Sequence, residues 1–182
     1  MSDLLSIEKA ALVRSGRMLF DDLSLTLAAG EAMHVTGPNG CGKSSLIRMV
    51  AGLLAPSAGR VERAAVALAD EGLALDRELP LHRALHFWGG PKLGKAMAAF
   101  DLDRLSEVPV RLLSTGQAKR ARLARVMASD ARLWLLDEPL NGLDRDGVVR
   151  LDDAIAEHRA SGGAVLAASH VPLGGAWREH KL

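Results

Sequence analysis

Hydrophobic and polar residues alternate loosely over residues 4–28, the pattern of strands that bury one face. A turn at Ser15-Gly16 divides this stretch, so we predict an antiparallel region with strands at 4–13 and 23–31. Elsewhere the apolar stretches run on without alternation, which is typical of strands buried on both faces. These buried strands are predicted at 32–37, 132–139 and 164–169, with one or two more strands after a turn within 57–69.

Helical periodicity fills the intervals between the buried strands. Alternating strands and helices predict an α/β fold of the P-loop NTPase type, with a mostly parallel core sheet, the antiparallel region and a small helical lobe at about 73–128. We expect a single domain, 1–182, that ends in a short tail after His170. The helices are predicted at 43–51 with Gly52 as C-cap, 79–88 and 95–105 split by Gly89-Gly90-Pro91, 116–128, and 144–160 with Asp144 as N-cap.

The composition narrows the functional classes. The 182 residues include 23 basic and 22 acidic side chains, a net charge of +1 that gives no electrostatic reason to expect a nucleic-acid partner. Cys41 is the one cysteine, so an intramolecular disulfide is impossible, and the N-terminus lacks the pattern of a signal peptide; both favour the cytoplasm. Because no apolar run is long enough to span a bilayer, a membrane role would have to come through a partner.

Residues 37–44, GPNGCGKS, match the phosphate-binding pattern G-x-x-x-x-G-K-[ST] between a predicted strand and a predicted helix. Glycines there let backbone N–H groups surround phosphates, Lys43 supplies a positive charge, and Ser44 offers a hydroxyl to Mg²⁺. The alternative is a chance glycine turn. Cys41 occupies a free position and reads as a spacer rather than a reactive thiol. The predicted ATP phosphate-binding residues are Gly37, Pro38, Asn39, Gly40, Cys41, Gly42, Lys43, Ser44 and Ser45.

The strand in LWLLDEP, 133–139, delivers two carboxylates to its C-terminal end, the edge where open α/β sheets bind ligands. Unpaired charge is costly beside a buried strand, so both carboxylates should have a task. Asp137 would hold the ligand shell of a metal ion, and Glu138 would orient or deprotonate the attacking water. The alternative is an ordinary solvated strand end. His170, just past the last buried strand, is either structural or within reach of a γ-phosphate.

The segment LLSTGQAKRARLARVMA, 112–128, begins with a polar turn that resembles a second anion site. Ser114 can cap the helix, and Gly116 allows close approach of another group. Taken alone, Lys119, Arg120, Arg122 and Arg125 form a solvated basic face. Because this helix start lies a short distance before LLDEP, the two motifs together indicate a function more specifically than either motif alone.

These motifs together resemble the nucleotide-binding subunit of ABC transporters. GPNGCGKSS resembles Walker A, LSTGQ the ABC signature, LWLLDEP Walker B, LNGLD the D-loop and His170 the switch histidine. The resemblance implies a head-to-tail dimer in which ATP lies between one copy's Walker A and its partner's signature, residues Ser114, Thr115, Gly116 and Gln117. It also implies Glu138 and His170 as catalytic residues, Ser44 and Asp137 as Mg²⁺-site residues, and Asp144 as a D-loop residue.

Three departures from that family stand out. Thr115 occupies a signature position that is most often glycine. The Q-loop glutamine is absent, since Gln117 is the chain's only glutamine, and Glu71 or Asp70 is expected to take its place near Mg²⁺. The aromatic residue that stacks on adenine is also missing, and Arg14 is the residue in that register, with a planar guanidinium that can stack instead.

Within the family, four segments are similar to the compact ATPase of the cytochrome c maturation system, the CcmA type: MLFDDLSLTLAAGE, LSTGQAKRARLARV, RLWLLDEPLNGLD and SGGAVLAASHVPL. This implies an ATPase on the cytoplasmic side of the inner membrane, bound to integral membrane subunits that handle haem or release a haem-loaded chaperone. The alternatives are the ATPase of another small-molecule or lipid exporter, and a soluble ABC-type ATPase of DNA repair or chromosome structure. The sequence leaves the roles of Trp88 and Trp177 undecided.

Overall fold

The computed structural model describes residues 3–72 and 75–182. Residues 1–2 and 73–74 lie outside the described residues, so the predicted start of the helical lobe at 73 is not placed. In chain order, the elements are β1 (Asp3–Arg14), β2 (Arg17–Ala28), β3 (Ala32–Thr36), α1 (Lys43–Ala51), β4 (Ala58–Arg63), β5 (Val66–Ala69), α2 (Leu81–Gly89), α3 (Leu93–Ala99), α4 (Thr115–Ala128), β6 (Leu133–Asp137), α5 (Arg145–Ala160), β7 (Ala164–Ala168) and β8 (Arg178–Lys181), with short 3-10 turns at Gly90–Lys92, Asp103–Leu105 and Val110–Leu112.

Two sheets organise these elements, and they confirm the predicted fold class. A five-stranded sheet has the order β5-β6-β7-β3-β8, and every neighbouring pair in it is parallel. A three-stranded sheet has the order β2-β1-β4 and is antiparallel. The turn between β1 and β2 falls at Ser15-Gly16, as predicted.

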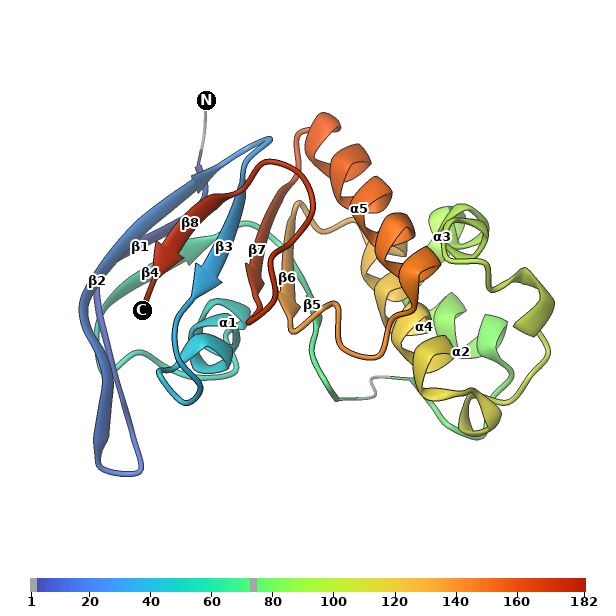
Figure 1. Ribbon diagram of the computed structural model, residues 1–182, viewed down its shortest axis with the longest axis horizontal. Helices are drawn as coiled ribbons and strands as arrows, with labels where there is room; N and C mark the ends of the chain where they lie inside the picture. The colour runs from blue at the N-terminus through green and yellow to red at the C-terminus, as the bar shows by residue number, and fades with distance from the viewer. Residues whose placement is uncertain (1–2, 73–74) are drawn as a thin grey trace.

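The parallel sheet separates two apolar cores. Leu133 and Leu135 of β6 point to one side, where they join α1 and the antiparallel sheet. Trp134 and Leu136 point to the other, where they join α4 and α5 and, beyond them, the smaller helices α2 and α3. Figure 1 shows these layers, with the antiparallel sheet at one end of the molecule and α2 and α3 at the other. Such two-sided burial is the reason that β6 and β7 read as continuous apolar runs.

The strand order determines where the candidate site forms. Strands β6, β7 and β3 are consecutive neighbours and run in the same direction. Their carboxyl ends therefore lie at one edge of the sheet, which brings together the loop at 37–42, Glu138 and His170.

The structure differs from the sequence-based elements at three places. The strand predicted at 23–31 begins earlier, at Arg17, and also ends earlier, at Ala28. The helix predicted at 95–105 ends at Ala99, because Asp101 adopts a left-handed backbone, φ 53°, that cannot continue a helix. The tail after His170 is not simply a tail, since residues 178–181 form β8 and pair with β3 at the edge of the sheet.

No helix in residues 3–72 and 75–182 combines the length and the apolar character that crossing a bilayer requires.

Candidate functional site

The predicted phosphate-binding loop leads into α1 through a backbone that favours glycine. Gly42 is the N-cap residue, with φ 118°, and a β-carbon there would lie 3.3 Å from the β-carbon of Leu19. No side chain caps this helix start. The first-turn N–H groups of α1 are therefore free of side-chain acceptors, which suits an anion at the helix N-terminus.

Lys43 lies over its own loop. Its Nζ donates to the carbonyl oxygens of Gly37 at 2.8 Å and Pro38 at 3.2 Å, and the residue is 6% exposed. Cys41 also contacts the loop, donating its backbone N–H to the Pro38 carbonyl. The loop thus holds one concentrated positive charge beside the start of α1.

A cavity of about 480 Å³ opens beside this loop. The loop and the strand β1 line one side of it, and Glu138 contributes from the end of β6. The structure therefore brings Arg14 and Glu138 to the same cavity as the predicted phosphate-binding residues. The lining residues are Arg14, Ser15, Leu19, Asn39, Gly40, Gly42, Lys43, Ser44, Ser45 and Glu138.

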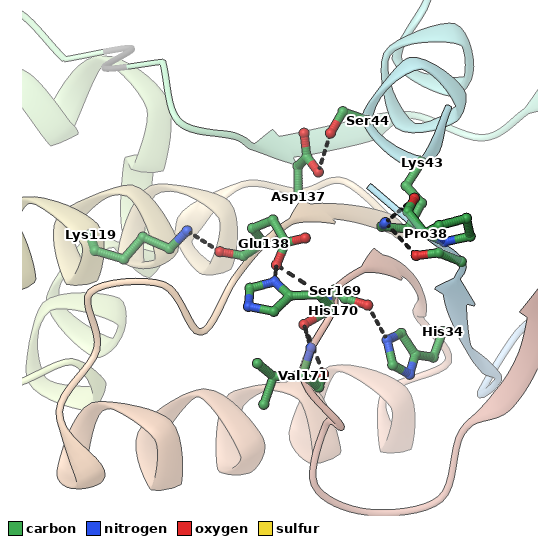
Figure 2. Close-up of polar contacts among 11 residues, drawn as sticks. His34, Pro38, Lys43, Ser44, Lys119, Asp137, Glu138, Ser169, His170 and Val171 are labelled. Atoms are coloured by element: carbon green, nitrogen blue, oxygen red, sulfur yellow. Dashed lines mark hydrogen bonds and ion pairs between the residues drawn. The ribbon is translucent and has the colours of Figure 1, made fainter. Parts of the chain in front are cut away.

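Asp137 and Ser44 meet at the edge of this cavity. The Ser44 hydroxyl donates to Oδ1 of Asp137 at 2.9 Å, which joins the start of α1 to the end of β6 (Figure 2). Asp137 is 5% exposed, and burial raises the pKa of its carboxyl, while the hydrogen bond from Ser44 acts in the opposite direction. A hydroxyl beside a carboxylate is a donor set that suits Mg²⁺, which in nucleotide sites takes one or two protein oxygens together with phosphates and waters.

Within the described residues, no group of three or more His, Cys, Asp and Glu side chains is arranged to hold a metal by itself. A Mg²⁺ ion at Ser44 and Asp137 would therefore depend on oxygens from the nucleotide.

Glu138 has an unusual backbone. Its φ is 45°, in the left-handed region that non-glycine residues rarely adopt, and the next residue, Pro139, restricts it further. Its N–H donates to the carbonyl of Ala168 in β7 at 2.8 Å. Its Oε2 lies 2.8 Å from Nδ1 of His170. His170 thus contacts the carboxylate of Glu138, and its ring is not among the residues that line the cavity.

A second histidine, His34, supports this pair from β3. Its Nε2 lies 3.0 Å from the carbonyl oxygen of Ser169, the residue before His170 (Figure 2). The ring of Trp177 packs edge-on at 6.3 Å between centroids. Sequence reasoning did not single out His34, although a histidine within the apolar strand 32–36 was a signal. The contact also places Trp177 at the edge of the core rather than on a free surface.

The signature residues lie away from this cavity. Ser114 and Gln117 form a capping box: Ser114 Oγ accepts the backbone N–H of Gln117 at 3.3 Å, and Gln117 Oε1 accepts the N–H of Ser114 at 2.9 Å. A β-carbon on Gly116 would lie 3.1 Å from the carbonyl of Gly142, so this glycine permits contact with the turn before Asp144. Ser114 and Thr115 are exposed. Asp144 caps α5, as predicted.

The basic residues of α4 are not a solvated face, which corrects the interpretation of that helix taken alone. Lys119 is 2% exposed, and its Nζ donates to the carbonyl of Glu138 at 2.7 Å. Arg122 donates to the carbonyls of Asp70 and Glu71, and Arg125 donates to that of Leu68. These cations fix α4 to the end of β5 and to Walker B.

The candidates for the missing glutamine follow β5 directly. The carboxylate of Asp70 lies 4.0 Å from Arg48 and contributes to raising the pKa of Asp137. Glu71 is exposed, and its charge acts on Lys119 instead. Of these two candidates, only Asp70 acts on the pKa of Asp137, and its effect is smaller than that of burial and of Glu138.

An aromatic pair is exposed at the end of α2. Phe87 is 81% exposed and Trp88 43%, and their rings meet edge-on. The guanidinium of Arg125 lies 4.9 Å from the centre of the Trp88 ring. Leu53, after α1, is also exposed and lines a hollow of about 240 Å³ with Trp88. This surface is apolar and adjoins the end of β5.

The sequence profile of the ABC transporter family matches residues 20–141. The chain belongs to the ABC transporter family. It is 54% identical over 180 residues to the cytochrome c biogenesis ATP-binding export protein CcmA of Sphingopyxis alaskensis, covering 95% of this chain and 93% of that protein. It is 60% identical over 162 residues to the protein of that name from Novosphingobium aromaticivorans, covering 88% of this chain and 85% of that protein.

A solved structure shows the same fold as this ABC-type ATPase. The putative ABC transporter ATP-binding protein from Pyrococcus furiosus superposes with a TM-score of 0.85, over all of this chain and 98% of that one, at 20% identity. The family match and the relatives show that the activity of this ABC-type chain is ATP hydrolysis coupled to transport. They also confirm the resemblance to the CcmA type.

Proposed function

We propose that the chain is the ATPase subunit of a membrane ABC complex for cytochrome c maturation, and that it works as a head-to-tail dimer. The relatives that share half or more of its sequence carry the name of that system. The observation that carries the dimer is the division of the site. Glu138 and the phosphate loop line one cavity, whereas the signature residues at the start of α4 lie outside it, with Ser114 and Thr115 exposed. A second copy would bring its Ser114, Thr115, Gly116 and Gln117 to the open side.

The polar residues in and beside the cavity have proposed tasks. Lys43 and the backbone N–H groups of residues 40–45 hold the β- and γ-phosphates. Ser44 and Asp137 would hold Mg²⁺, which neutralises phosphate charge when bound. Glu138 orients the attacking water and accepts its proton. His170, bonded to Glu138, would steady that carboxylate and reach the γ-phosphate as the dimer closes.

The departures from the family pattern have proposed tasks as well. Arg14 lines the cavity, where its Nη1 donates to Ser45 Oγ at 3.5 Å, and the proposed task of its planar guanidinium is to stack on adenine. Asp70, rather than Glu71, is the better placed substitute for the missing glutamine, because its charge acts on Asp137. Residues 1–182 work as one ABC-type domain, with helices α2 to α4 as its helical lobe.

Membrane subunits are the proposed partners, and the cytoplasmic side of the inner membrane is the proposed location. The aromatic pair Phe87 and Trp88 supports such a contact, because a large exposed apolar surface usually has a partner. ATP binding would close the dimer and hydrolysis would reopen it. The movement would drive haem handling or the release of a haem-loaded chaperone by those subunits.

The role of Glu138 is tested by Glu138→Gln, which keeps size and polarity but removes the base. Turnover should fall on the order of 100-fold or more, with ATP affinity within about two-fold of the parent. The variant should also accumulate as a dimer when ATP is present, measured by light scattering. Turnover at the parent rate would refute the assignment.

The transporter is tested by recovery of the tagged chain from solubilised membranes under native conditions. Recovery of a haem-handling membrane subunit supports the cytochrome c maturation system. Recovery of the membrane subunit of another exporter would replace that system with the alternative. Phe87→Ser is a matched variant, expected to reduce recovery while leaving ATP turnover of the isolated chain unchanged.

A further inference from the structure

Lys119 is a buried cation to which the proposed catalytic scheme gives no task. It lies one turn into α4, behind the signature residues, and is 2% exposed. Burial lowers the pKa of its ammonium to about 8, with a further lowering from nearby Arg122, while the carboxylates of Asp137, Glu71 and Glu138 act in the opposite direction. A lysine kept in so unfavourable a place needs a specific partner.

The partner is the main chain of Glu138. Lys119 Nζ donates to the Glu138 carbonyl at 2.7 Å, and the contact is drawn in Figure 2. On the other side of the same residue, the Glu138 N–H donates to Ala168 of β7. The N–H of Glu138 is therefore held by the sheet, and its carbonyl by α4 through Lys119 at 2.7 Å and by the N–H of Asn141 at the longer distance of 3.3 Å.

This double hold matters because the backbone of Glu138 is strained. A non-glycine residue at φ 45° is less stable than in an ordinary conformation, and it persists only where the surroundings enforce it. Without the donor from Lys119, the Glu138 carbonyl would keep only the longer contact from the Asn141 N–H, and the peptide between Glu138 and Pro139 would be held less firmly in this conformation. The carboxylate would then be positioned less firmly against His170 and in the cavity.

We propose that Lys119 is a positioning residue for ATP hydrolysis: it holds Glu138 in its left-handed backbone conformation and thereby ties the carboxylate to the signature helix α4. The inference rests on the proposed role of Glu138. It also gives a route for coupling, since a partner's ATP that shifts the start of α4 would move the donor that fixes the base of the same chain.

The test compares variants of the full chain in steady-state ATP hydrolysis. Lys119→Met keeps the apolar stem and removes the donor; kcat should fall on the order of ten-fold or more, because small misplacements of catalytic groups have effects of that size, while KM for ATP stays within about two-fold. Lys119→Arg retains a donor and should recover most of the lost kcat. Lys119→Gln, a donor too short to reach the carbonyl, should behave as Lys119→Met and replaces it if that variant does not fold.

Arg120→Met is the matched control on the same helix. Arg120 also binds a main-chain carbonyl, that of Phe100, but far from Walker B. Its loss should lower the melting temperature with kcat unchanged. If Lys119→Met and Lys119→Gln retain the parent kcat, or lose kcat and ATP binding together, Lys119 has no positioning role.

A double-mutant cycle separates this inference from the proposed function. In the Glu138→Gln background, Lys119→Met should cause little further loss, since its effect passes through the missing base. An equal loss in both backgrounds would overturn the inference while leaving the role of Glu138 intact. If Glu138→Gln itself turned over ATP at the parent rate, both assignments would fall together.

Discussion

Helices α1 and α4 both begin at a turn that contains glycine, yet they complete their first turns in opposite ways. At α1 no side chain caps the helix, and a lysine lies beside the open N–H groups. At α4 the capping box of Ser114 and Gln117 satisfies the N–H groups of these two residues. The start of α1 is suited to bind an anion of its own chain. The start of α4 is capped by its own side chains and presents Ser114 and Thr115 as an exposed surface, which suits contact with another molecule.

This difference explains why one small ATPase carries two such turns. In the proposed dimer, the start of α1 would be one half of a nucleotide site, next to Glu138, the proposed base. The start of α4 would supply the complementary half to a different copy.

The largest effect is expected at α1. Lys43→Ala removes the one concentrated charge of the loop, so ATP affinity should fall on the order of 100-fold, the weight of a charge-assisted contact to phosphate. Equilibrium binding of MgATP to the isolated chain measures it. Thr115→Ala, at the start of α4, should leave this affinity unchanged. Equal losses in both variants would mean that both starts bind the same chain's nucleotide.

At α4 the expected effect is on turnover rather than on binding. Thr115→Asp adds a negative charge at a helix N-terminus, which by itself stabilises the helix by about 0.3–1 kcal/mol. The same charge would repel a partner's phosphate, so turnover should fall by about ten-fold or more. Thermal unfolding and ATPase assays on one preparation measure both quantities.

Mixing the two defective chains sharpens this prediction. A dimer of one Lys43→Ala chain and one Thr115→Asp chain contains a site with an intact loop and an intact signature, so activity should return to up to about a quarter of the parent in a statistical mixture. No recovery on mixing, with dimers present, would contradict a site shared between copies.

A smaller effect is expected on the self-capped helix start. Ser114→Ala removes the acceptor of the Gln117 N–H, and the free energy of unfolding should fall by about 1 kcal/mol. Urea denaturation measures it. Gly42 at α1 has no equivalent cap to lose. If Ser114→Ala lowered ATP binding to the isolated chain without changing stability, the contrast between the two starts would be lost.

The smallest effect is expected at His158, which lies away from both helix starts and should change stability alone. His158 stacks on Trp134 at the opposite edge of the sheet, and burial lowers the pKa of its imidazole. Because the folded pKa lies below that of the unfolded chain, His158 should bind protons preferentially on unfolding, and stability present above about pH 6.5 should decline as the pH falls. His158→Gln should reduce this decline in urea denaturation. An unchanged pH dependence would show that His158 does not contribute.

The features of this molecule that could be predicted from the sequence are those that depend on short stretches of the chain. The phosphate loop, the carboxylates at 137–138 and the cap at Ser114 each depend on neighbours within a few residues. Strand β8 could not be found in this way, because its residues are polar and only pairing with β3 makes them a strand. The role of Lys119 could not be predicted for a related reason, since its partner is a main-chain carbonyl that only the fold brings near.

Backbone strain is likewise invisible in sequence. Nothing in LLDEP indicates that Glu138 would turn left-handed, because that conformation results from the junction of β6, β7 and α4. The close approach of Gly116 to the Gly142 carbonyl could not be predicted either. Gly116 therefore has a packing role within the chain in addition to its proposed contact with a partner. Trp177 proved to pack at the core edge, whereas Trp88 is exposed beside Arg125.

The left-handed Glu138 sets stability against activity at a single position. Glycine adopts positive φ freely, so Glu138→Gly would relieve the backbone while removing the carboxylate. A laboratory selection for heat resistance alone would therefore favour a chain that no longer hydrolyses ATP. Efforts to make this ATPase more robust should hold residue 138 constant and look for gains elsewhere.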